Sequence, residues 1–288
     1  LRAEQITIKK VNWNDKVTNL KEIANELNIS LDSILFIDDS PFEINFIKEN
    51  LPEVTVLQVP ERLYEYPSLF RTHLGRFFDL SLTAEDGKKV EIYKQQEERA
   101  SAKQSFENID DYLGSLKLKL DLFEDDENFI ARMAQMTQKT NQFNLTTQRY
   151  TEKDIRKFIK DQNSNAFACN VSDIYGDHGI TGLTIIHYDH ERLSATIDTF
   201  LLSCRIIGRN IEFALMDYLI KIFKQKNIKQ VCARYIQTRK NELVANFYDN
   251  SSFYSETTTE SEKTYVMDTY KYKPNLINYI EVNDGRQN

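Results

Sequence analysis

Cysteine is scarce in this sequence, and the few cysteines show no pattern that would join them. Cys169, Cys204 and Cys232 lie far apart without a Cys-x-x-Cys pair, and the four histidines show no matching spacing. The pattern therefore excludes a disulfide framework and a zinc site. A reducing, cytoplasmic setting fits this cysteine usage best.

Positive charge is also in deficit. The 37 lysines and arginines are outnumbered by 44 aspartates and glutamates, which gives a formal net charge of −7. General nucleic-acid binding requires an excess of clustered basic residues, so no nucleic-acid partner is expected. Local basic residues remain available to attract an acidic partner, among them Arg149, Arg205, Arg209 and Lys240.

Long apolar runs are missing as well. No run approaches the ~20 residues of a membrane helix, and no signal peptide opens the chain, so no membrane association is expected. The sequence begins with Leu1 rather than Met, which leads us to expect a longer natural chain. With 288 residues, 41% of them hydrophobic, the chain is long enough for two packed domains.

The first 60 residues alternate strand and helix patterns. Short strands are predicted at 6–8, 33–39 and 54–59, and a helix follows Lys16. A capping box at Ser40–Glu43 predicts a second helix. This order is typical of a parallel sheet with helices on its faces.

Two adjacent carboxylates, Asp38 and Asp39, end the second of these strands. Functional groups gather at the carboxyl ends of strands in such sheets, and paired carboxylates there commonly hold Mg²⁺ near a phosphate. The alternative is that they only cap the turn into the next helix.

The pattern changes in the second half of the chain. A charged helix is predicted from Thr83 to about Gln104. From Leu116 to about Asp268 the order is strand, two helices, three strands, helix, strand, helix and two strands. The details include a hairpin around Tyr175–Gly179, a helix at 241–250, an exposed turn at 255–262 and a polar tail at 271–288.

The central motif is a buried strand at 198–202, then Cys204, an Arg-x-x-Gly turn from Arg205 to Gly208, and a helix from about Ile211. A helix N-terminus favours anions, and glycine lets a phosphate approach the backbone. A thiol flanked by arginines is predicted to favour its thiolate and so to act as a nucleophile. The alternative is a small buried residue before a glycine turn.

Other polar residues are weaker candidates. Asp177, His178 and Asp198 lie near strand ends, where one of them is a candidate general base, the alternative being a turn or surface residue. The polar stretch after the first helix offers Lys139, Asn141, Gln142 and Asn144 to orient substrate hydroxyls, the alternative being helix termination.

The element order after Leu116 resembles the GNAT acyltransferase fold. Arg205–Asn210 stands where that fold has the loop that cradles the pyrophosphate of acyl-CoA, and Asn241–Tyr248 is similar to its last helix. The resemblance implies cofactor-binding roles for seven residues: Arg205, Ile207, Gly208, Arg209, Asn210, Asn241 and Tyr248. Asn210 replaces a small residue of that loop and follows the bulky Arg209, so a phosphopantetheine arm is expected to fit better than CoA.

The N-terminal region is similar to the second half of a haloacid dehalogenase (HAD) domain. Lys16 matches the lysine that steadies the phosphoryl group, and Phe36–Ser40 matches the acidic Mg²⁺-binding motif, which implies Asp38 and Asp39 as metal ligands. The nucleophilic aspartate of Asp-x-Asp-x-Thr occurs nowhere in this chain. Phosphoryl transfer therefore depends on residues upstream of Leu1 or is absent.

Four motifs in order, at 12–16, 37–43, 139–146 and 202–209, resemble the FkbH family. The resemblance implies an enzyme that takes a glyceryl unit from a small phosphorylated three-carbon substrate, 1,3-bisphosphoglycerate, and passes it to an acyl carrier protein. Cys204 is then the acyl-accepting nucleophile or lines the thioester site. Two alternatives are a HAD-type Mg²⁺-dependent phosphatase or phosphotransferase with a GNAT-like binding module, and a non-catalytic carrier-binding fragment.

The predicted fold class is α/β and α+β. It comprises the C-terminal half of a HAD-like Rossmannoid domain (1–75), a helical linker (76–114), a GNAT-like mixed-sheet domain (115–270) and the polar tail (271–288). Because the first HAD strand is absent, its neighbours lose their common partner. That region is predicted to be rearranged, paired with a second copy as a homodimer, or poorly ordered.

Overall fold

The computed structural model describes residues 6–73, 75, 89–275 and 277–284. The chain divides into two units, residues 1–101 and 102–288, which are described separately. The division falls within helix α6 (Lys89–Lys103). The start predicted for this helix, at Thr83, lies outside the described residues.

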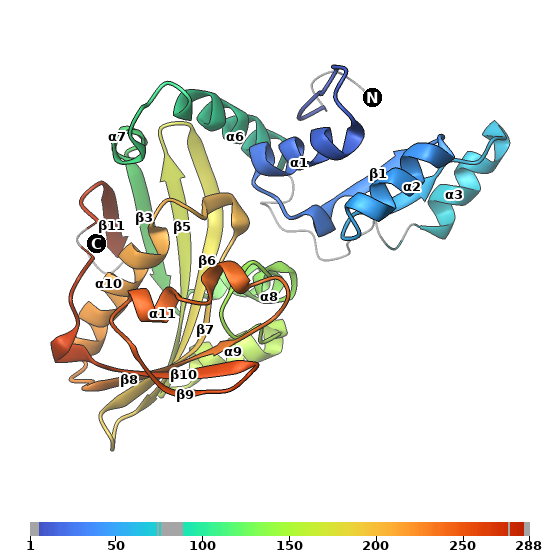
Figure 1. Cartoon of the computed structure of the whole chain (residues 1–288). Helices are drawn as coiled ribbons and strands as arrows, with labels where there is room; N and C mark the ends of the chain where they lie inside the picture. Colours follow the sequence, from blue (N-terminus) through green and yellow to red (C-terminus); the bar gives the residue numbers. More distant parts are fainter. Residues whose placement is uncertain (1–5, 74, 76–88, 276, 285–288) are drawn as a thin grey trace. The chain divides into compact units, whose positions relative to one another are not determined.

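The N-terminal unit contains a small parallel sheet with helices (Figure 1). Its elements are α1 (Lys16–Leu27), β1 (Leu35–Asp38), α2 (Pro41–Asn50), β2 (Thr55–Gln58) and α3 (Tyr66–Thr72). Helix α1 begins at the predicted position because the Asp15 carboxylate accepts the backbone N–H of Thr18. Helix α2 begins as predicted too, with Ser40 accepting the N–H of Glu43 and Pro41 in the first turn.

The strand predicted at 6–8 is wrong. Residues 6–10 have no regular structure, and β1 pairs with β2 in a sheet of two strands within the described residues. A three-residue strand forms only where a neighbour takes its backbone hydrogen bonds, and no described strand lies on that side of β1. Whether this region is a rearranged part of a HAD-like domain stays a prediction.

The C-terminal unit is built on one mixed sheet. Among the described residues it has nine strands, in the order β11-β3-β5-β6-β7-β8-β10-β9, with β4 paired to β7. The strands are β3 (Leu118–Glu124), β4 (Phe143–Asn144), β5 (Ser164–Asp173), β6 (Gly176–Asp189), β7 (Ser194–Leu202), β8 (Gln230–Ile236), β9 (Tyr254–Thr258), β10 (Glu262–Asp268) and β11 (Ile280–Asp284). The pairs β7–β8 and β11–β3 are parallel, and the other neighbours are antiparallel.

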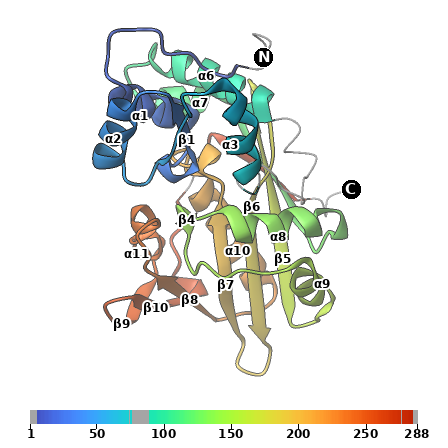
Figure 2. The same cartoon turned by 90° about the vertical axis from the view of Figure 1, so that its right-hand side faces the viewer.

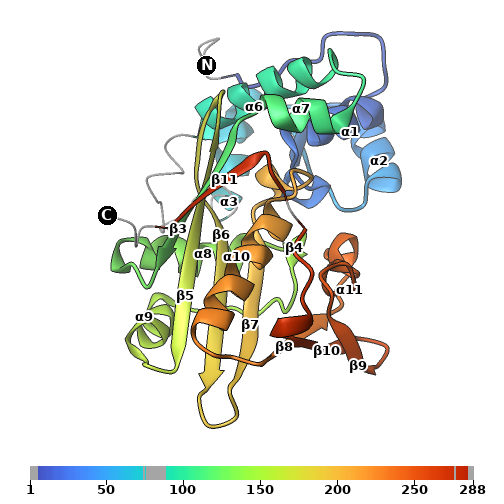
Figure 3. The same ribbon diagram turned by 90° about the vertical axis from the view of Figure 1, so that its left-hand side faces the viewer.

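Helices pack on both faces of this sheet. The helices are α7 (Ile109–Ser115), α8 (Ile130–Lys139), α9 (Glu152–Lys160), α10 (Ile211–Gln225) and the short α11 (Phe247–Asn250). Helices α8 and α9 lie on one face (Figure 2) and α10 lies on the opposite face (Figure 3). From Leu116 to Asp268 the longer helices and strands follow the predicted order, and the short strand β4 between α8 and α9 is an addition to it. No helix in the described stretches is long and apolar enough to cross a membrane.

Three local predictions are wrong in detail. The helix predicted at 241–250 is a 3-10 turn at Glu242–Val244 followed by α11. The stretch 255–262 mostly forms β9 and the start of β10, so only 259–261 turn. The turn between β5 and β6 is just Ile174 and Tyr175, because the Asp173 carboxylate accepts the backbone N–H groups of Tyr175 and Gly176 and closes the turn early. Asp177 and His178 therefore lie in β6.

The predicted polar tail at 271–288 is also wrong over its described part. Tyr272 is buried, and β11 pairs in parallel with β3 at the edge of the sheet. The Asp217 carboxylate on α10 accepts hydrogen bonds from the Tyr272 hydroxyl at 2.6 Å and from the Asn275 backbone N–H at 3.0 Å. These contacts to the side chain of Asp217 on α10 hold the segment in place. Its polar composition alone predicts a tail.

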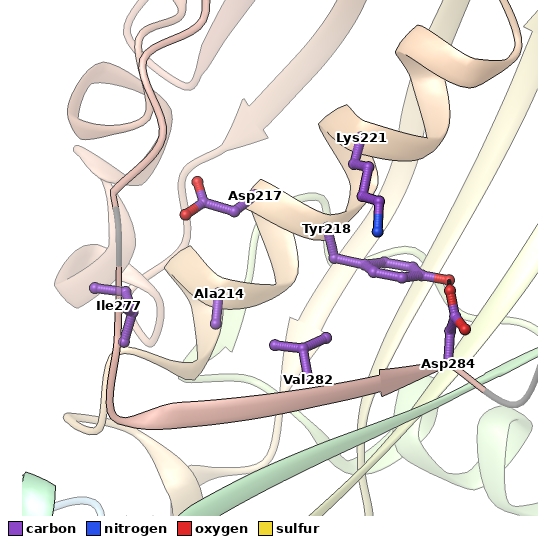
Figure 4. Close-up of a pocket in the computed structure, with 7 residues that line it drawn as sticks. All are labelled: Ala214, Asp217, Tyr218, Lys221, Ile277, Val282 and Asp284. Atoms are coloured by element: carbon purple, nitrogen blue, oxygen red, sulfur yellow. Dashed lines mark hydrogen bonds between the residues drawn. The ribbon is translucent and has the colours of Figure 1, made fainter. Parts of the chain in front are cut away.

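A cavity of about 250 Å³ lies between α10 and this C-terminal segment. Figure 4 shows Ala214, Asp217, Tyr218 and Lys221 on the helix, facing Ile277, Val282 and Asp284. The Tyr218 hydroxyl donates to Asp284 across it at 3.4 Å. The segment is therefore part of the folded unit.

Replacing Asp217 with Ala should lower the free energy of unfolding by about 2 kcal/mol, because the buried Tyr272 hydroxyl and the Asn275 amide lose a charged acceptor. Urea denaturation followed by circular dichroism measures this change. Glu281→Ala is the control, since that side chain is 59% exposed in its pair with Lys119 and should change stability by less than about 0.5 kcal/mol. Equal stability of the Asp217→Ala variant and the wild type would contradict the anchoring role.

Candidate active site at the carboxyl end of β7

Strand β7 separates from its parallel neighbour β8 partway along its length. The two strands pair from Ser194 with Gln230 to Ile197 with Ala233, and no further. On the other side of β7, the register with β6 shifts so that Asp198 is left over as the extra residue of a β-bulge. A bulge bends its strand and strengthens its twist, which accounts for the divergence of β7 from β8 beyond this point.

The chain itself fills the space between the diverging strands. Phe143 and Asn144 of β4 pair with Leu202 and Leu201 of β7. The backbone of Leu145 then bridges both strands, donating to Phe200 O at 3.2 Å and accepting from Ile236 N at 2.8 Å. Backbone groups that the divergence would leave without partners are satisfied in this way.

Asn144 and Asn241 fasten this insertion. Asn144 is fully buried, donates to Thr140 O at 3.1 Å and accepts from Thr147 N at 2.9 Å. Asn241 is also fully buried and donates to the carbonyl oxygens of Asn144 and Ile236, each at 2.9 Å. Their amides are engaged in folding the segment, so the geometry supports neither the substrate role of Asn144 nor the cofactor role of Asn241.

The remaining residues of the polar stretch lie at the end of α8. The Arg149 guanidinium donates to the backbone oxygens of Thr137 and Thr140 and to the Asn141 side chain at 2.6 Å. These contacts agree with the alternative reading of this stretch, in which polar side chains terminate the helix. Lys139 is exposed and Gln142 is half-buried, and a substrate contact for either stays a prediction.

A polar cluster surrounds the bulge residue Asp198. Its carboxylate accepts hydrogen bonds from Tyr150 and from Thr199, each at 2.8 Å, and its backbone oxygen accepts one from Thr146 at 2.8 Å. Burial and the Asp198 carboxylate raise the pKa of Tyr150 well above its usual range. Asp198 is one of the residues predicted from the sequence, whereas Tyr150 is not, because its only signal is a tyrosine just before a helix.

Cys204 follows β7 closely and opens a short 3-10 turn, Cys204–Ile206. Its side chain is only partly accessible. Burial raises the pKa of the thiol, and the Arg205 guanidinium lowers it by less. The prediction that the thiolate is favoured is therefore wrong, because desolvation of the charged sulfur outweighs the neighbouring positive charge.

Arg209 does not flank the thiol as predicted, because it turns into the protein. It is 6% exposed and donates to Asp173 at 3.2 Å and to the Arg205 carbonyl oxygen at 2.9 Å. It also donates to Nε2 of the fully buried His178 at 2.8 Å. A guanidinium N–H can only donate, so the Nε2 lone pair is already used and His178 offers no base there.

Asp177, the neighbouring candidate base, has an exposed side chain that accepts the backbone N–H of Gly179 at 2.8 Å. This contact is an Asx turn inside β6. It agrees with the turn-residue alternative and brings Asp177 to none of the other candidates.

The glycine turn leads into α10. Gly208 is exposed with φ +81°, and a Cβ added to it would meet no atom within 4 Å, so the backbone conformation alone accounts for the glycine. Ile207 packs against the core. Asn210 has φ 61° and donates to the Tyr279 hydroxyl at 2.5 Å. Its side chain makes no hydrogen bond to the helix that it precedes.

The other candidate of this region, Tyr248, is 1% exposed and packs on Phe253 and Tyr265, with ring centroids 4.9 and 5.3 Å away. Burial, together with the Asp198 charge, raises the pKa of its hydroxyl. Besides the cavity at α10, a second cavity lies beside β10, where Val266–Asp268 help to line it, and a third lies at the end of β3, where Leu122–Asp126 help to line it. None of these three cavities is lined by Tyr248, Cys204 or Gly208. An open channel to these residues is therefore not among them.

The N-terminal candidates meet at the carboxyl end of β1. The Lys16 ammonium forms an ion pair with Asp38 and lies 3.9 Å from Glu43. Partial burial raises the pKa of Asp38, but hydrogen bonds from Lys16 and the Ser40 amide lower it by more. The carboxylate of Asp38 is therefore ionised and already paired.

A Mg²⁺ ion does not fit these residues alone. Asp39 is exposed beside Asp38, and the described residues contain no group of three carboxylate, histidine or cysteine side chains placed to hold a metal. Mg²⁺ demands an octahedral oxygen shell, whereas Asp38 faces an ammonium group.

Comparison with known proteins gives weak likenesses only. No family model and no curated protein matches the chain. The chain is similar to a solved structure of the spermidine/spermine N-acetyltransferase of Vibrio cholerae (15% identity, 53% of this chain and 95% of that one, TM-score 0.43). It is also similar to the ribosomal-protein-S18-alanine N-acetyltransferase of Escherichia coli (11% identity, 52% and 94% coverage, TM-score 0.40). Likeness of this extent assigns neither a fold family nor an activity.

Replacing Arg209 with Met should lower the free energy of unfolding by about 3–5 kcal/mol, because Asp173 would remain buried without its positive partner. Thermal and urea denaturation measure the loss. The double variant with Asp173→Asn should recover part of it. Arg192→Met is the control, since Arg192 is 84% exposed. A loss no larger than in this control would show that the buried pair does not hold the turn.

Alkylation of Cys204 by iodoacetamide should be slow at pH 7 and should reach half of its maximal rate above the ordinary thiol pKa, because burial raises the pKa of this thiol. Site-resolved mass spectrometry separates this thiol from Cys232, which also has a raised pKa. The urea-unfolded protein supplies the ordinary value. A midpoint in the folded protein below that value would contradict the assignment.

Proposed function

We propose that this protein is an acyltransferase of the FkbH-like class, with a GNAT-like C-terminal unit, which passes a glyceryl unit to the thiol of an acyl carrier protein. The observation that carries the proposal is the junction after β7. There, a partly accessible thiol follows a strand that bends away from its parallel neighbour, and a glycine turn leads from it into a helix N-terminus.

In the proposed reaction the sulfur of Cys204 attacks the carbonyl carbon of a three-carbon acyl phosphate. A carbon–sulfur bond forms, the carbon–oxygen bond to phosphate breaks, and the departing phosphate takes the thiol proton. The carrier thiol then attacks the resulting thioester, the unit moves to the carrier, and Cys204 regains a proton. Because the pKa of Cys204 is raised, proton removal in the first step is slow at neutral pH unless the substrate assists it.

The carrier protein would approach over basic residues. Of the four predicted ones, Arg209 is buried, whereas Arg149 and Lys240 are exposed and Arg205 is half-buried. Charges at such a surface raise the rate of encounter with an acidic partner. A phosphopantetheine arm, rather than CoA, would lie along the turn at Gly208.

A second candidate function belongs to the N-terminal unit. Lys16 and Asp38 meet at the end of β1, the arrangement that a HAD-type phosphatase or phosphotransferase requires around its phosphate. The aspartate nucleophile of that chemistry is not in the sequence, so this function ranks below acyl transfer.

The test is intact-mass analysis after incubation with 1,3-bisphosphoglycerate and a holo acyl carrier protein. We expect a glyceryl adduct on the wild-type protein and then on the carrier, and at least a hundredfold less of both with Cys204→Ala. Cys232→Ala is the matched control, because Cys232 is also partly accessible and has a raised thiol pKa, and it should keep the full yield.

If acylation of the carrier is unchanged in Cys204→Ala, the nucleophilic role of this cysteine is contradicted. Release of phosphate without any acyl adduct would favour the phosphatase instead. Binding of the carrier without either product would leave a non-catalytic carrier-binding protein.

A further inference from the structure

The cavity between α10 and the C-terminal segment is lined by none of the residues assigned to acyl transfer. Its volume is about 250 Å³. Sites for drug-sized ligands enclose about 300–1,000 Å³, so this cavity suits a smaller molecule. Such sites combine an apolar wall with a few polar groups that fix the orientation of the ligand.

Both parts of such a site are present here. Ala214, Ile277 and Val282 form the apolar wall (Figure 4). The Tyr218 hydroxyl donates to Oδ2 of Asp284 at 3.4 Å. Burial and the charge of Asp284 raise the pKa of Tyr218 to about 12, so this hydroxyl keeps its proton and stays a donor.

Two opposite charges line the cavity without pairing. Lys221 extends toward the Tyr218 side chain, whose hydroxyl end meets Asp284 (Figure 4). Lys221 forms no ion pair in the part of the chain that the structure describes. Oδ1 of Asp284 is buried and has no hydrogen-bond partner among the described residues. An unsatisfied carboxylate oxygen costs free energy, and a donor bound in the cavity would remove that cost.

The third charged group of the cavity is already used. Both oxygens of Asp217 accept hydrogen bonds, from the Tyr272 hydroxyl at 2.6 Å and from the Asn275 backbone at 3.0 Å. One positive and one negative group therefore remain for a ligand. A ligand that carries charge of only one sign would leave one of them without a partner.

We propose that this cavity binds a free α-amino acid with a branched apolar side chain, whose carboxylate pairs with Lys221 and whose ammonium group donates to Asp284. The side chain of the ligand would pack on Ala214, Ile277 and Val282. The proposal does not depend on the proposed acyl transfer.

A ligand in this position would join α10 to the C-terminal segment. The same segment reaches the turn before α10, where the Asn210 amide donates to the Tyr279 hydroxyl at 2.5 Å. Binding should therefore stabilise the docking of residues 277–284, because a ligand favours the conformation to which it binds.

Isothermal titration of the whole protein with L-leucine tests the proposal. We expect one molecule to bind with a Kd of about 1 mM or below, a strength within reach of a ligand of this size. 4-Methylpentanoate lacks the ammonium group and 3-methylbutylamine lacks the carboxylate. Each should bind at least about tenfold more weakly, because one charge-assisted hydrogen bond is lost.

Lys221→Met keeps the length of the side chain and removes its charge, so it should weaken L-leucine binding at least about tenfold. Asp284→Asn is the second variant and should weaken binding to a similar extent. Lys224→Met is the matched control, since Lys224 is an exposed lysine of the same helix outside the cavity, and it should bind L-leucine like the wild type.

Hydrogen exchange in the presence of L-leucine locates the site, and residues 277–284 should exchange more slowly. Absence of L-leucine binding to the wild type, or equal affinity of the wild type and Lys221→Met, would overturn the proposal. Equally tight binding of 4-methylpentanoate would overturn the role of Asp284. Protection confined to other parts of the chain would place the ligand elsewhere and also overturn the proposal.

Discussion

The arrangement of the C-terminal unit depends on the bulge at Asp198. One extra residue in β7 bends the strand away from β8, and the backbone groups on the two facing edges then need other partners. The stretch from Phe143 to Leu145 supplies them by lying between the strands. A bulge in a single strand thereby explains why a loop between two helices is buried in the middle of a sheet.

The same constraint concentrates polar groups at one place. Asp198 is the residue that the bulge releases from regular pairing, and its carboxylate accepts hydrogen bonds from the hydroxyl groups of Tyr150 and Thr199. Beyond it, β7 ends at Leu202, and Cys204 and the turn at Gly208 follow. Functional side chains are common at strand ends and bulges, because the regular alternation of side chains between the two faces of the sheet is interrupted there.

Buried charge fixes the turn after β7. Arg209 ties the loop to Asp173 and His178 at the hairpin of β5 and β6, and one of its N–H groups holds the Arg205 carbonyl oxygen. Removing one partner of such a network costs far more than the network contributes, so it fixes one conformation of the loop. Arg209, which the sequence predicts as a cofactor-binding residue, therefore holds the loop in its conformation instead.

Local patterns in the sequence determined the elements. Asp15 and Ser40 start their helices, the alternation around Leu118 marks β3, and the apolar run before Cys204 marks β7, because each signal acts within a few residues. Only the tertiary structure decided where polar side chains point. The inward turn of Arg209, the burial of Glu212 and the docking of the segment at Tyr272 depend on partners far away in the chain, and no local pattern encodes those partners.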